Sequence, residues 1–220
     1  MVRGQSPGGL ETRRPRTLPT MSNTFWNQRY AAGELIYGDA PNDFLVQMAG
    51  RLPRSGQALD IGAGQGRNAL FLASRGLDVL AVDQSEVGMR KAQQLAQSRN
   101  LTLRTQAADL QEFDAETASF DVVSSIFVHL PAALRALVHR RVRAWLKPGG
   151  LFLLEAYAPD QIERYTGGPK DSALLASLDV ILSELSGMQI EHQAALVRTV
   201  SEGQYHTGEA SVVQVLARNA

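Results

Sequence analysis

The alternation of short apolar runs with helical patterns constrains the fold of this chain most. Between residues 58 and 157, runs typical of strands, such as DVLAVD at 78–83, alternate with helical patterns such as EVGMRKAQQLAQSRN at 86–100. Parallel strands need crossover helices of this kind, and right-handed crossovers place them on both faces of the sheet. We therefore predict an α/β chain with a doubly wound, mostly parallel sheet.

Caps and stop signals predict where the individual elements lie. Strands are expected at 58–62, 78–83, 101–109, 120–127 and 151–157. Helices are expected from Ser22 to Gly33, from Asn42 to just before Pro53, and over 66–76 and 86–100. A further long helix should begin at Pro131 and stop at the Pro-Gly-Gly run that ends at residue 150.

The two ends of the chain differ from this middle. Residues 187–203 and 209–219 are β-rich runs with no helix between them, so they should pair antiparallel. The segment before them, 159–182, reads as a loop followed by one more helix. The first twenty residues hold four Arg, three Pro and three Gly, a composition that favours disorder. We therefore expect a disordered leader over 1–21 and one domain over 22–220.

Charge and composition exclude several classes of function. The 22 basic and 22 acidic residues give no net charge, so bulk charge does not favour DNA or an anionic membrane as a partner. The absence of cysteine excludes disulfides, thiolate nucleophiles and Cys-based zinc sites. No apolar run reaches the roughly 18–20 residues of a membrane span. We expect a cytoplasmic monomer or homodimer with no bound metal.

The stretch ALDIGAGQGRNAL at 58–70 is the clearest binding motif. A strand here runs into Gly62, Gly64 and Gly66 and then into a helix. Such turns lie at the carboxyl edge of a parallel sheet, where bare backbone and free helix N–H groups receive ligands. The spacing is G-x-G-x-G followed by Arg67, which departs from the G-x-G-x-x-G of dinucleotide sites. A tight turn without a ligand is the alternative.

Two acids at the ends of neighbouring strands specify the ligand further. Asp83 closes the strand after the glycine loop and is suited to bind a ribose diol. Asp109 closes the next strand and could accept a hydrogen bond from an adenine amino group. No Gly-Lys-Ser/Thr run follows the glycines, so a P-loop is excluded. Several acids at one edge would repel a pyrophosphate and favour a nucleoside that carries positive charge.

At this point the chain resembles class I S-adenosylmethionine-dependent methyltransferases. The motifs, in order, are LDIGAGQGRNALFLASRG, VLAVDQS, AADL, FDVVSSIFVHL and LKPGGLFLLEAY. The opening FWNQRYAAGELIYGDAPNDFL is similar to the tellurite-resistance and thiopurine-type branch. The resemblance covers residues 23–220. It implies a Rossmann-like, seven-stranded sheet, S-adenosyl-L-methionine as cofactor and S-adenosyl-L-homocysteine as product.

The resemblance also implies residue roles. At the methionine end of the cofactor the expected residues are Asp60, Gly62 and Gly64, with Arg67 and Tyr37 toward the carboxylate. At the adenosine end they are Asp83, Gln84, Asp109 and Leu110. Beside the sulfonium they are Ser125 and Ile126. For Asp60 a turn or helix-capping role is the alternative, and for Leu110 and Ile126 plain core packing is the alternative.

The methyl acceptor is expected to be a small molecule, with a thiol or chalcogen oxyanion suggested by the branch resemblance. The stretch SSIFVHLP lacks the Asn/Asp-Pro-Pro-aromatic run common in enzymes that methylate nucleobase or amide nitrogens. His129 follows the fourth strand and could be a base or line the pocket. Arg198 and His206, in the C-terminal runs, are the other catalytic candidates, although their spacing departs from that of the tellurite branch.

Other interpretations stay open from the sequence alone. A nicotinamide-dependent oxidoreductase is disfavoured by the glycine spacing and by the third-strand acid. A non-catalytic domain that binds S-adenosylmethionine as a sensor is the second alternative. Trp26 and Tyr30, four residues apart on one helix, either cover the ligand or pack on the sheet. The basic residues of 131–145 are interpreted as a solvated helix face.

Overall fold

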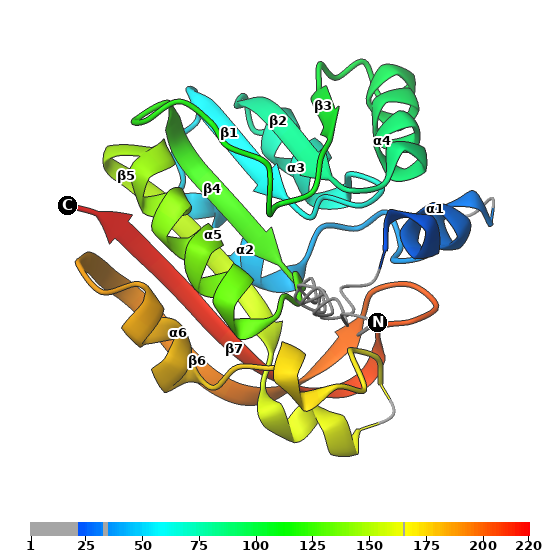
Figure 1. Cartoon of the computed structure of the whole chain (residues 1–220). Coiled ribbons are helices and arrows are strands. Elements are labelled where there is room, and N and C mark those ends of the chain that lie inside the picture. The colour runs from blue at the N-terminus through cyan, green and yellow to red at the C-terminus, as the bar shows by residue number, and fades with distance from the viewer. Residues whose placement is uncertain (1–21, 33–34, 165) are drawn as a thin grey trace, which may run out of the picture.

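The structure, a computed structural model, describes residues 22–32, 35–164 and 166–220. Its centre is a seven-stranded sheet in the order β3-β2-β1-β4-β5-β7-β6 (Figure 1). The pairs β1–β2, β1–β4, β2–β3 and β4–β5 are parallel, while β5–β7 and β6–β7 are antiparallel. This confirms the predicted doubly wound sheet with a C-terminal antiparallel pair. The expected leader at 1–21 lies outside the described residues.

The strands and helices follow the predicted order. The strands are β1 Gln57–Ile61, β2 Asp78–Asp83, β3 Arg104–Ala107, β4 Phe120–Ile126, β5 Leu146–Tyr157, β6 Met188–Ser201 and β7 Thr207–Asn219. The α-helices are α1 Asn23–Ala31, α2 Asp43–Met48, α3 Arg67–Ser74, α4 Glu86–Ser98, α5 Ala132–Trp145 and α6 Leu178–Glu184. Short 3₁₀ turns are η1 Ala49–Arg51, η2 Pro159–Glu163 and η3 Ser172–Leu174.

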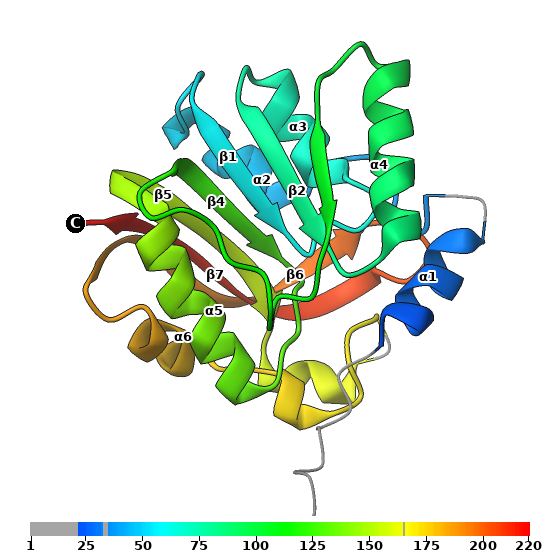
Figure 2. The ribbon, with the colours of Figure 1, turned by 45° about the horizontal axis from the view of Figure 1, so that its top comes forward.

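Helices cover both faces of the sheet, because successive side chains of each strand point to opposite sides. On β4, Val122 packs with residues of α2, α3 and α4, and Val123 packs with residues of α5 and α6. Figures 1 and 2 show α5 and α6 together on one side of the sheet and α2 and α3 on the other. The two cores hold the parallel strands in place, so their carboxyl ends form a fixed edge.

The long helix α5 ends earlier than predicted. It stops at Trp145, and Leu146 is already extended and paired with Phe120 as the first residue of β5. The residue before a proline is driven out of the helical region, so Lys147, before Pro148, cannot continue the helix. The Pro-Gly-Gly run therefore lies inside the start of β5 and not at the end of a helix. Strand β3 is also shorter than the predicted 101–109.

The interpretation of α5 as a solvated basic face is wrong for two of its residues. Arg135 and His139 are 7% and 3% exposed. Both meet Glu184 of α6, with Arg135 Nη2 2.9 Å and His139 Nδ1 2.8 Å from its carboxylate. Arg140 and Arg143 are exposed, as predicted. The first two residues therefore join α5 to α6.

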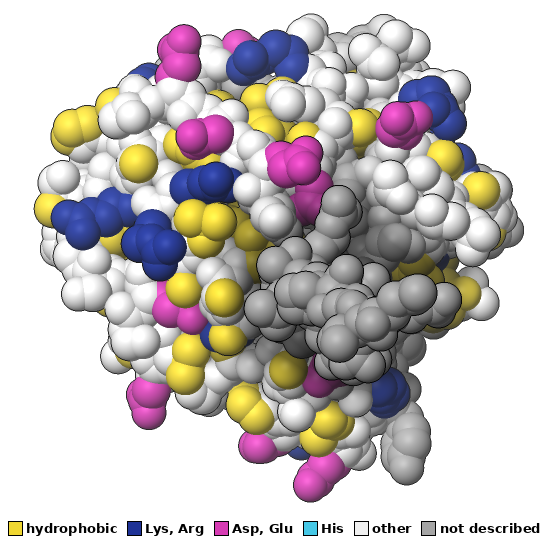
Figure 3. All heavy atoms as spheres, in the orientation of Figure 1, with side chains coloured by type: hydrophobic (Ala, Val, Ile, Leu, Met, Phe, Trp, Pro, Cys, Tyr) yellow, Lys and Arg dark blue, Asp and Glu magenta, His cyan; other side chains and the backbone are white. Residues whose placement is uncertain are grey.

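Basic and acidic side chains are interspersed over the visible described surface in Figure 3, in keeping with the zero net charge. Within the ranges that the structure describes, no helix has the length and apolarity needed to span a membrane.

Candidate active site

A cavity of about 370 Å³ lies at the carboxyl ends of β1, β2 and β4. Figure 2 shows α1 and the turn between β6 and β7 at this edge of the sheet. The volume lies in the range of ordinary small-molecule sites, about 300–1,000 Å³. Of the residues that the sequence singled out, the lining includes Tyr37, Gly62, Gly64, Arg67, Asp83, Gln84, Asp109, Leu110, Ile126, His129 and His206. The edge is the one where ligands bind in doubly wound sheets.

The glycine loop needs its glycines for backbone conformation and for packing. Gly62, Gly64 and Gly66 have φ of 64°, 57° and 88°, a region that other residues rarely adopt. A Cβ on Gly62 would lie 2.5 Å from a methyl of Val128, and one on Gly64 would lie 2.7 Å from the Tyr30 hydroxyl. The loop is therefore tightly enclosed by the β4 loop and by α1 while its backbone still lines the cavity.

Asp83 is held in place by the backbone and remains available to a ligand. One carboxylate oxygen accepts the Gly64 N–H at 2.9 Å, and the other accepts the Ser85 N–H at 2.8 Å. Each oxygen keeps a further lone pair, so the group can accept two more hydrogen bonds, as a vicinal diol would donate. Burial raises the pKa of Asp83, against the lowering effect of these two N–H groups. This geometry fits a ribose.

The cavity is also lined by Gln84, Asp109, Leu110 and Ile126. One carboxylate oxygen of Asp109 accepts the Gln111 N–H at 2.8 Å, which fixes the side chain at the end of β3. Leu110 and Ile126 are 8% and 6% exposed and belong to the two cores as well as to the cavity wall. An apolar wall with one carboxylate at its edge suits a purine ring.

Asp60 and Ser125 are buried at 1% and 5% exposure and are not among the cavity-lining residues. Asp60 accepts a hydrogen bond from the Ser124 hydroxyl at 2.6 Å, across the β1–β4 pairing. Burial raises its pKa to about 7, against the lowering effects of Ser124, Arg67 and the Ala69 N–H in the first turn of α3. This placement fits the turn-and-capping alternative for Asp60 better than a direct cofactor contact.

Helix α1 places aromatic rings over the glycine loop. Trp26 and Tyr30 stack with ring centroids 5.6 Å apart, and Tyr37 lies 6.3 Å from Tyr30. All three line the cavity, so this face covers the ligand site. The Asn27 side chain accepts hydrogen bonds from the Ser85 hydroxyl at 2.7 Å and the Val87 N–H at 3.2 Å. These contacts dock α1 on the first turn of α4.

His129 and His206 lie among aromatic rings in the cavity wall. His129 stacks on Tyr157 at 5.3 Å, and His206 lies 4.7 Å from Tyr37 and 4.9 Å from Phe127. Burial lowers the pKa of His129 to about 3 and also lowers that of His206. His129 Nε2 is buried and has no hydrogen-bond partner among the described residues, whereas His206 Nδ1 lies 3.9 Å from a carboxylate oxygen of Glu202. The lowered pKa values favour the neutral form of both rings.

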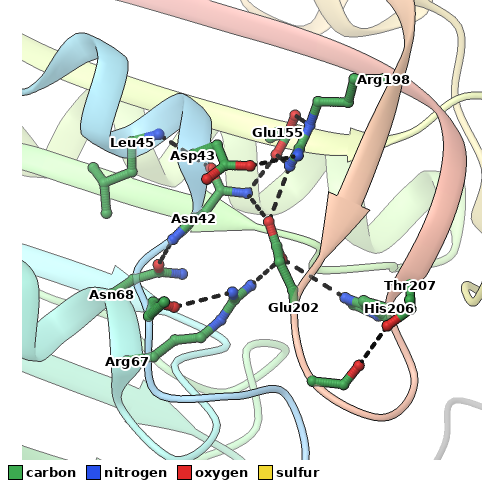
Figure 4. A network of polar contacts seen from close by, with 12 residues as sticks. Asn42, Asp43, Leu45, Arg67, Asn68, Glu155, Arg198, Glu202, His206 and Thr207 are labelled. Carbon is green, nitrogen blue, oxygen red and sulfur yellow. Dashed lines mark hydrogen bonds and ion pairs between the residues drawn. The ribbon is translucent and has the colours of Figure 1, made fainter.

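Arg198 is held in a buried ionic network outside the cavity lining (Figure 4). It contacts Glu155 through two 2.8 Å hydrogen bonds, and its Nη2 lies 3.0 Å from Glu202. Arg67 reaches the other oxygen of Glu202 at 2.5 Å, and Asn42 donates to both carboxylates. The expectation that Arg198 lies in the reaction site is therefore not supported by its geometry. It ties the β6–β7 hairpin to β5.

Sequence reasoning did not identify Arg29, Glu155 or Glu202 as site residues. Arg29 lines the cavity from α1, and Glu202 joins Arg67 to the hairpin. Arg29 and Glu155 stand in stretches that carry the family resemblance, but neither stretch indicates the role of these residues, and Glu155 and Glu202 meet partners far away in the chain. Only the position of Arg29, one turn from Trp26 and next to Tyr30, offered a signal, since it shares the helix predicted to cover the ligand.

Comparisons with known proteins show which family and which solved structures this chain is similar to. Residues 58–150 match a family described as "Methyltransferase domain". A curated protein, Hemagglutinin 1 of Eikenella corrodens, is 34% identical over 99 residues, which are 44% of this chain and 33% of that protein. The match thus spans about a third of that relative.

Solved structures share the fold at low identity. TehB from Haemophilus influenzae has a TM-score of 0.69 and 18% identity, covering 90% of this chain and 67% of that one. A structure titled "Conversion of a Disulfide Bond into a Thioacetal Group during Echinomycin Biosynthesis" has a TM-score of 0.73 and 20% identity, with 91% and 92% covered. A methyltransferase from Methanosarcina mazei has a TM-score of 0.66 and 18% identity, with 79% and 96% covered.

Residues 58–150 therefore match a methyltransferase-domain family, and the chain has the fold of the class I S-adenosylmethionine-dependent methyltransferases. The cofactor of this class is S-adenosyl-L-methionine. The cavity fits it, because Asp83 keeps free acceptors for a diol and the glycine loop leaves no room for added side chains.

Proposed function

We propose that this chain transfers a methyl group from S-adenosylmethionine to a small-molecule acceptor bound in the same cavity. The observation that carries the proposal is that two unlike kinds of group line one cavity. Asp83 keeps free acceptors for a diol, and His129 and His206 present imidazoles whose lowered pKa values favour the neutral form. Such a cavity accommodates a nucleoside cofactor together with a second, smaller molecule.

The cofactor supplies an electrophilic methyl group on a sulfonium, which an acceptor displaces directly. The protein then has to align the acceptor and exclude water. The rings of Trp26, Tyr30, Tyr37 and Phe127 line the cavity and suit exclusion of water. The imidazoles of His129 and His206 line the same cavity and suit orientation of a polar acceptor through hydrogen bonds.

We propose a soft, readily ionised acceptor, such as a thiol or a chalcogen oxyanion. With a pKa of about 3, His129 is a weak proton acceptor at neutral pH, so an acceptor that needs strong deprotonation is disfavoured. The similar structure whose title describes conversion of a disulfide into a thioacetal concerns sulfur chemistry, which is compatible with this class.

The proposal is tested by calorimetric titration with S-adenosylhomocysteine, followed by methyl-transfer assays with labelled S-adenosylmethionine. The acceptor panel contains small thiols, selenite and tellurite on one side and amines and phenols on the other. Micromolar binding and turnover of the first group are expected. Turnover confined to amines or phenols overturns the acceptor class. Binding with no turnover of any acceptor supports a sensor, and no binding at millimolar ligand overturns the proposed function.

A further inference from the structure

Among the described residues, two arginines line the cavity, and they differ in whether a carboxylate already compensates their charge. The amino-acid part of the cofactor carries a carboxylate, which favours a cationic partner. The acids that line the cavity, Asp83 and Asp109, would repel that carboxylate. The sequence pointed to Arg67, with Tyr37, as the cation for this group. The second arginine is Arg29 on α1.

Arg67 is engaged within the protein. Its guanidinium lies 2.5 Å from the Glu202 carboxylate and donates to the Ala40 carbonyl at 3.4 Å, with 11% of its side chain exposed. Burial raises the pKa of Glu202, but the interactions with His206, Arg67 and Arg198 outweigh it and hold that pKa at about 2. Glu202 is thus charged at neutral pH and compensates Arg67. Figure 4 shows Arg67 directed toward Glu202.

Arg29 is placed differently. Its guanidinium carbon lies 4.8 Å from the Phe25 ring centroid and 4.3 Å from that of Tyr205, so aromatic rings cover its faces. One of its N–H groups donates to the Tyr37 hydroxyl at 3.3 Å. Within the described ranges, no carboxylate forms an ion pair with it. A guanidinium carries five N–H donors in one plane, so most of its edge is available to a ligand.

Helix α1 packs on the glycine loop, where the family resemblance implies that the methionine end of the cofactor lies. Tyr30, the next residue, has its hydroxyl 2.7 Å from where a Cβ of Gly64 would lie, so α1 sits directly on the glycine loop. Lys91 Nζ holds the Tyr30 carbonyl at 2.5 Å, and Arg29 contacts Tyr37 in the cavity wall. Arg29 thus adjoins in the chain the residue that contacts the glycine loop, and it lines the same cavity as that loop.

We infer that Arg29, supported by Tyr37, binds the carboxylate of the cofactor, and that Arg67 is a structural residue compensated by Glu202. This inference rests on the proposed function, since it assigns one further contact to the same site. A bidentate, charge-assisted contact of this kind is specific for a carboxylate. Loss of Arg29 should therefore weaken only those ligands that carry the amino-acid group.

The test compares two ligands that differ in that group. S-adenosylhomocysteine has the amino-acid part, and 5′-methylthioadenosine lacks it. For Arg29→Gln we expect the calorimetric Kd for S-adenosylhomocysteine to rise about 10- to 100-fold, and that for 5′-methylthioadenosine to change less than about twofold. The matched control is Arg90→Gln, an α4 arginine whose side chain is 65% exposed, and it should change neither value. Tyr37→Phe should weaken S-adenosylhomocysteine by a smaller factor.

Several outcomes overturn the inference. An equal loss for both ligands would mean that Arg29 only positions α1, and no loss for either would mean that it has no role. If Arg29→Gln does not fold, Arg29→Lys keeps the charge and is measured in its place, with a smaller selective loss expected. If the wild type binds neither ligand, the proposed function fails. If the wild type binds S-adenosylhomocysteine more tightly than 5′-methylthioadenosine, and the Arg29 variants keep the same ratio of affinities, only this inference fails.

Discussion

The two walls of the cavity are built in different ways. On the wall formed by β1, β2 and the glycine loop, side chains bond to nearby backbone, as Asp83 does with Gly64 and Ser85. On the wall formed by the β6–β7 hairpin, charged side chains meet across long stretches of chain. Asn42 and Glu202 are 160 residues apart, and Arg67 and Glu202 are 135 apart. Backbone geometry determines the first wall, and charge compensation determines the second.

The charges of the hairpin network compensate one another only while every member is present. Three carboxylates, from Asp43, Glu155 and Glu202, face two guanidiniums, from Arg67 and Arg198. Glu155 and Glu202 are nearly inaccessible to solvent. A buried ion pair that loses one member leaves a charge without compensation, which costs more than the pair contributed. The hairpin wall should therefore respond to single charge removals more strongly than the glycine-loop wall does.

The largest expected effect is on Glu202→Ala. The change leaves both Arg67 and Arg198 without one carboxylate, so we expect the free energy of unfolding to fall by about 3–5 kcal/mol in urea titrations. The control is Glu209→Ala in the same hairpin, where a 76% exposed carboxylate lies 3.6 Å from Arg164 and the loss should stay below about 1 kcal/mol. Equal losses for the two variants would contradict the comparison.

On the glycine-loop wall, Asp60→Asn should remove a pH dependence of the free energy of unfolding. The pKa of Asp60 is raised by burial from 3.8 to about 7, so between these values the folded state binds more protons than the unfolded state. Its stabilising contribution is present below pH 4 and is lost as pH rises through 7. Relative to the wild type, Asp60→Asn should gain about 2–4 kcal/mol between pH 4 and pH 8.

Urea titrations across that pH range measure this gain. A constant difference in the free energy of unfolding between wild type and Asp60→Asn does not affect the result, because only its change with pH is compared. The exposed carboxylate of Asp179 serves as the control, since Asp179→Asn should follow the wild-type profile. The hairpin behaves in the opposite sense, because the pKa of Glu202 is lowered to about 2 and its contribution is lost only in acid. Parallel profiles for wild type and Asp60→Asn would contradict this prediction.

Asp83→Ala should weaken the binding of S-adenosylhomocysteine by at least about 100-fold. Two hydrogen bonds to a charged group are worth roughly 1.5–3 kcal/mol each, and the alanine can accept neither. The variant also leaves the Gly64 and Ser85 N–H groups without their acceptor, so circular dichroism is needed to show that the fold is kept. Calorimetry measures the affinity. A folded variant with wild-type affinity would show that Asp83 is not the ribose-binding group.

The glycine-loop wall could be predicted from the sequence because its chemistry is local. Gly62, Gly64 and Gly66 need left-handed backbone at a strand end, and the order of strands then brings Asp83 and Asp109 to the same edge. Side-chain direction was harder to predict. Asp60 occupies a strand position whose side chain points to Ser124 and not into the cavity.

The hairpin wall could not be predicted in the same way. No periodic pattern in the sequence predicts which residue a charged side chain such as Glu202 will contact. From the sequence alone, Arg67 is typical of a ligand-binding arginine that follows a glycine loop. Only the folded chain brings Glu202 beside it. For the same reason the sequence did not distinguish His206, which lines the cavity, from Arg198, eight residues earlier, which does not.

The smallest expected effect is at Gly203, in the turn between β6 and β7. It separates the cost of a steric clash of an added Cβ from the cost of a left-handed backbone conformation. Gly203 and Gly149 have similar φ, 73° and 79°. A Cβ on Gly203 would lie 2.4 Å from the Gly38 nitrogen and from the Ile36 oxygen, whereas one on Gly149 would meet nothing within 4 Å. Both alanine variants bear the cost of the left-handed conformation. Only Gly203→Ala must also displace the turn from the segment that carries Tyr37.

We therefore expect Gly203→Ala to lower the free energy of unfolding by about 1–2 kcal/mol more than Gly149→Ala does. It should also weaken S-adenosylhomocysteine several-fold, because the Gln204 N–H and the Ile36 carbonyl, now 2.9 Å apart, would separate and move the adjoining Tyr37. Urea titration and calorimetry on both variants measure the two differences. If the variants lose equal stability and keep equal affinity, the turn is not a wall of the cofactor site, and the cavity depends on the glycine-loop side alone.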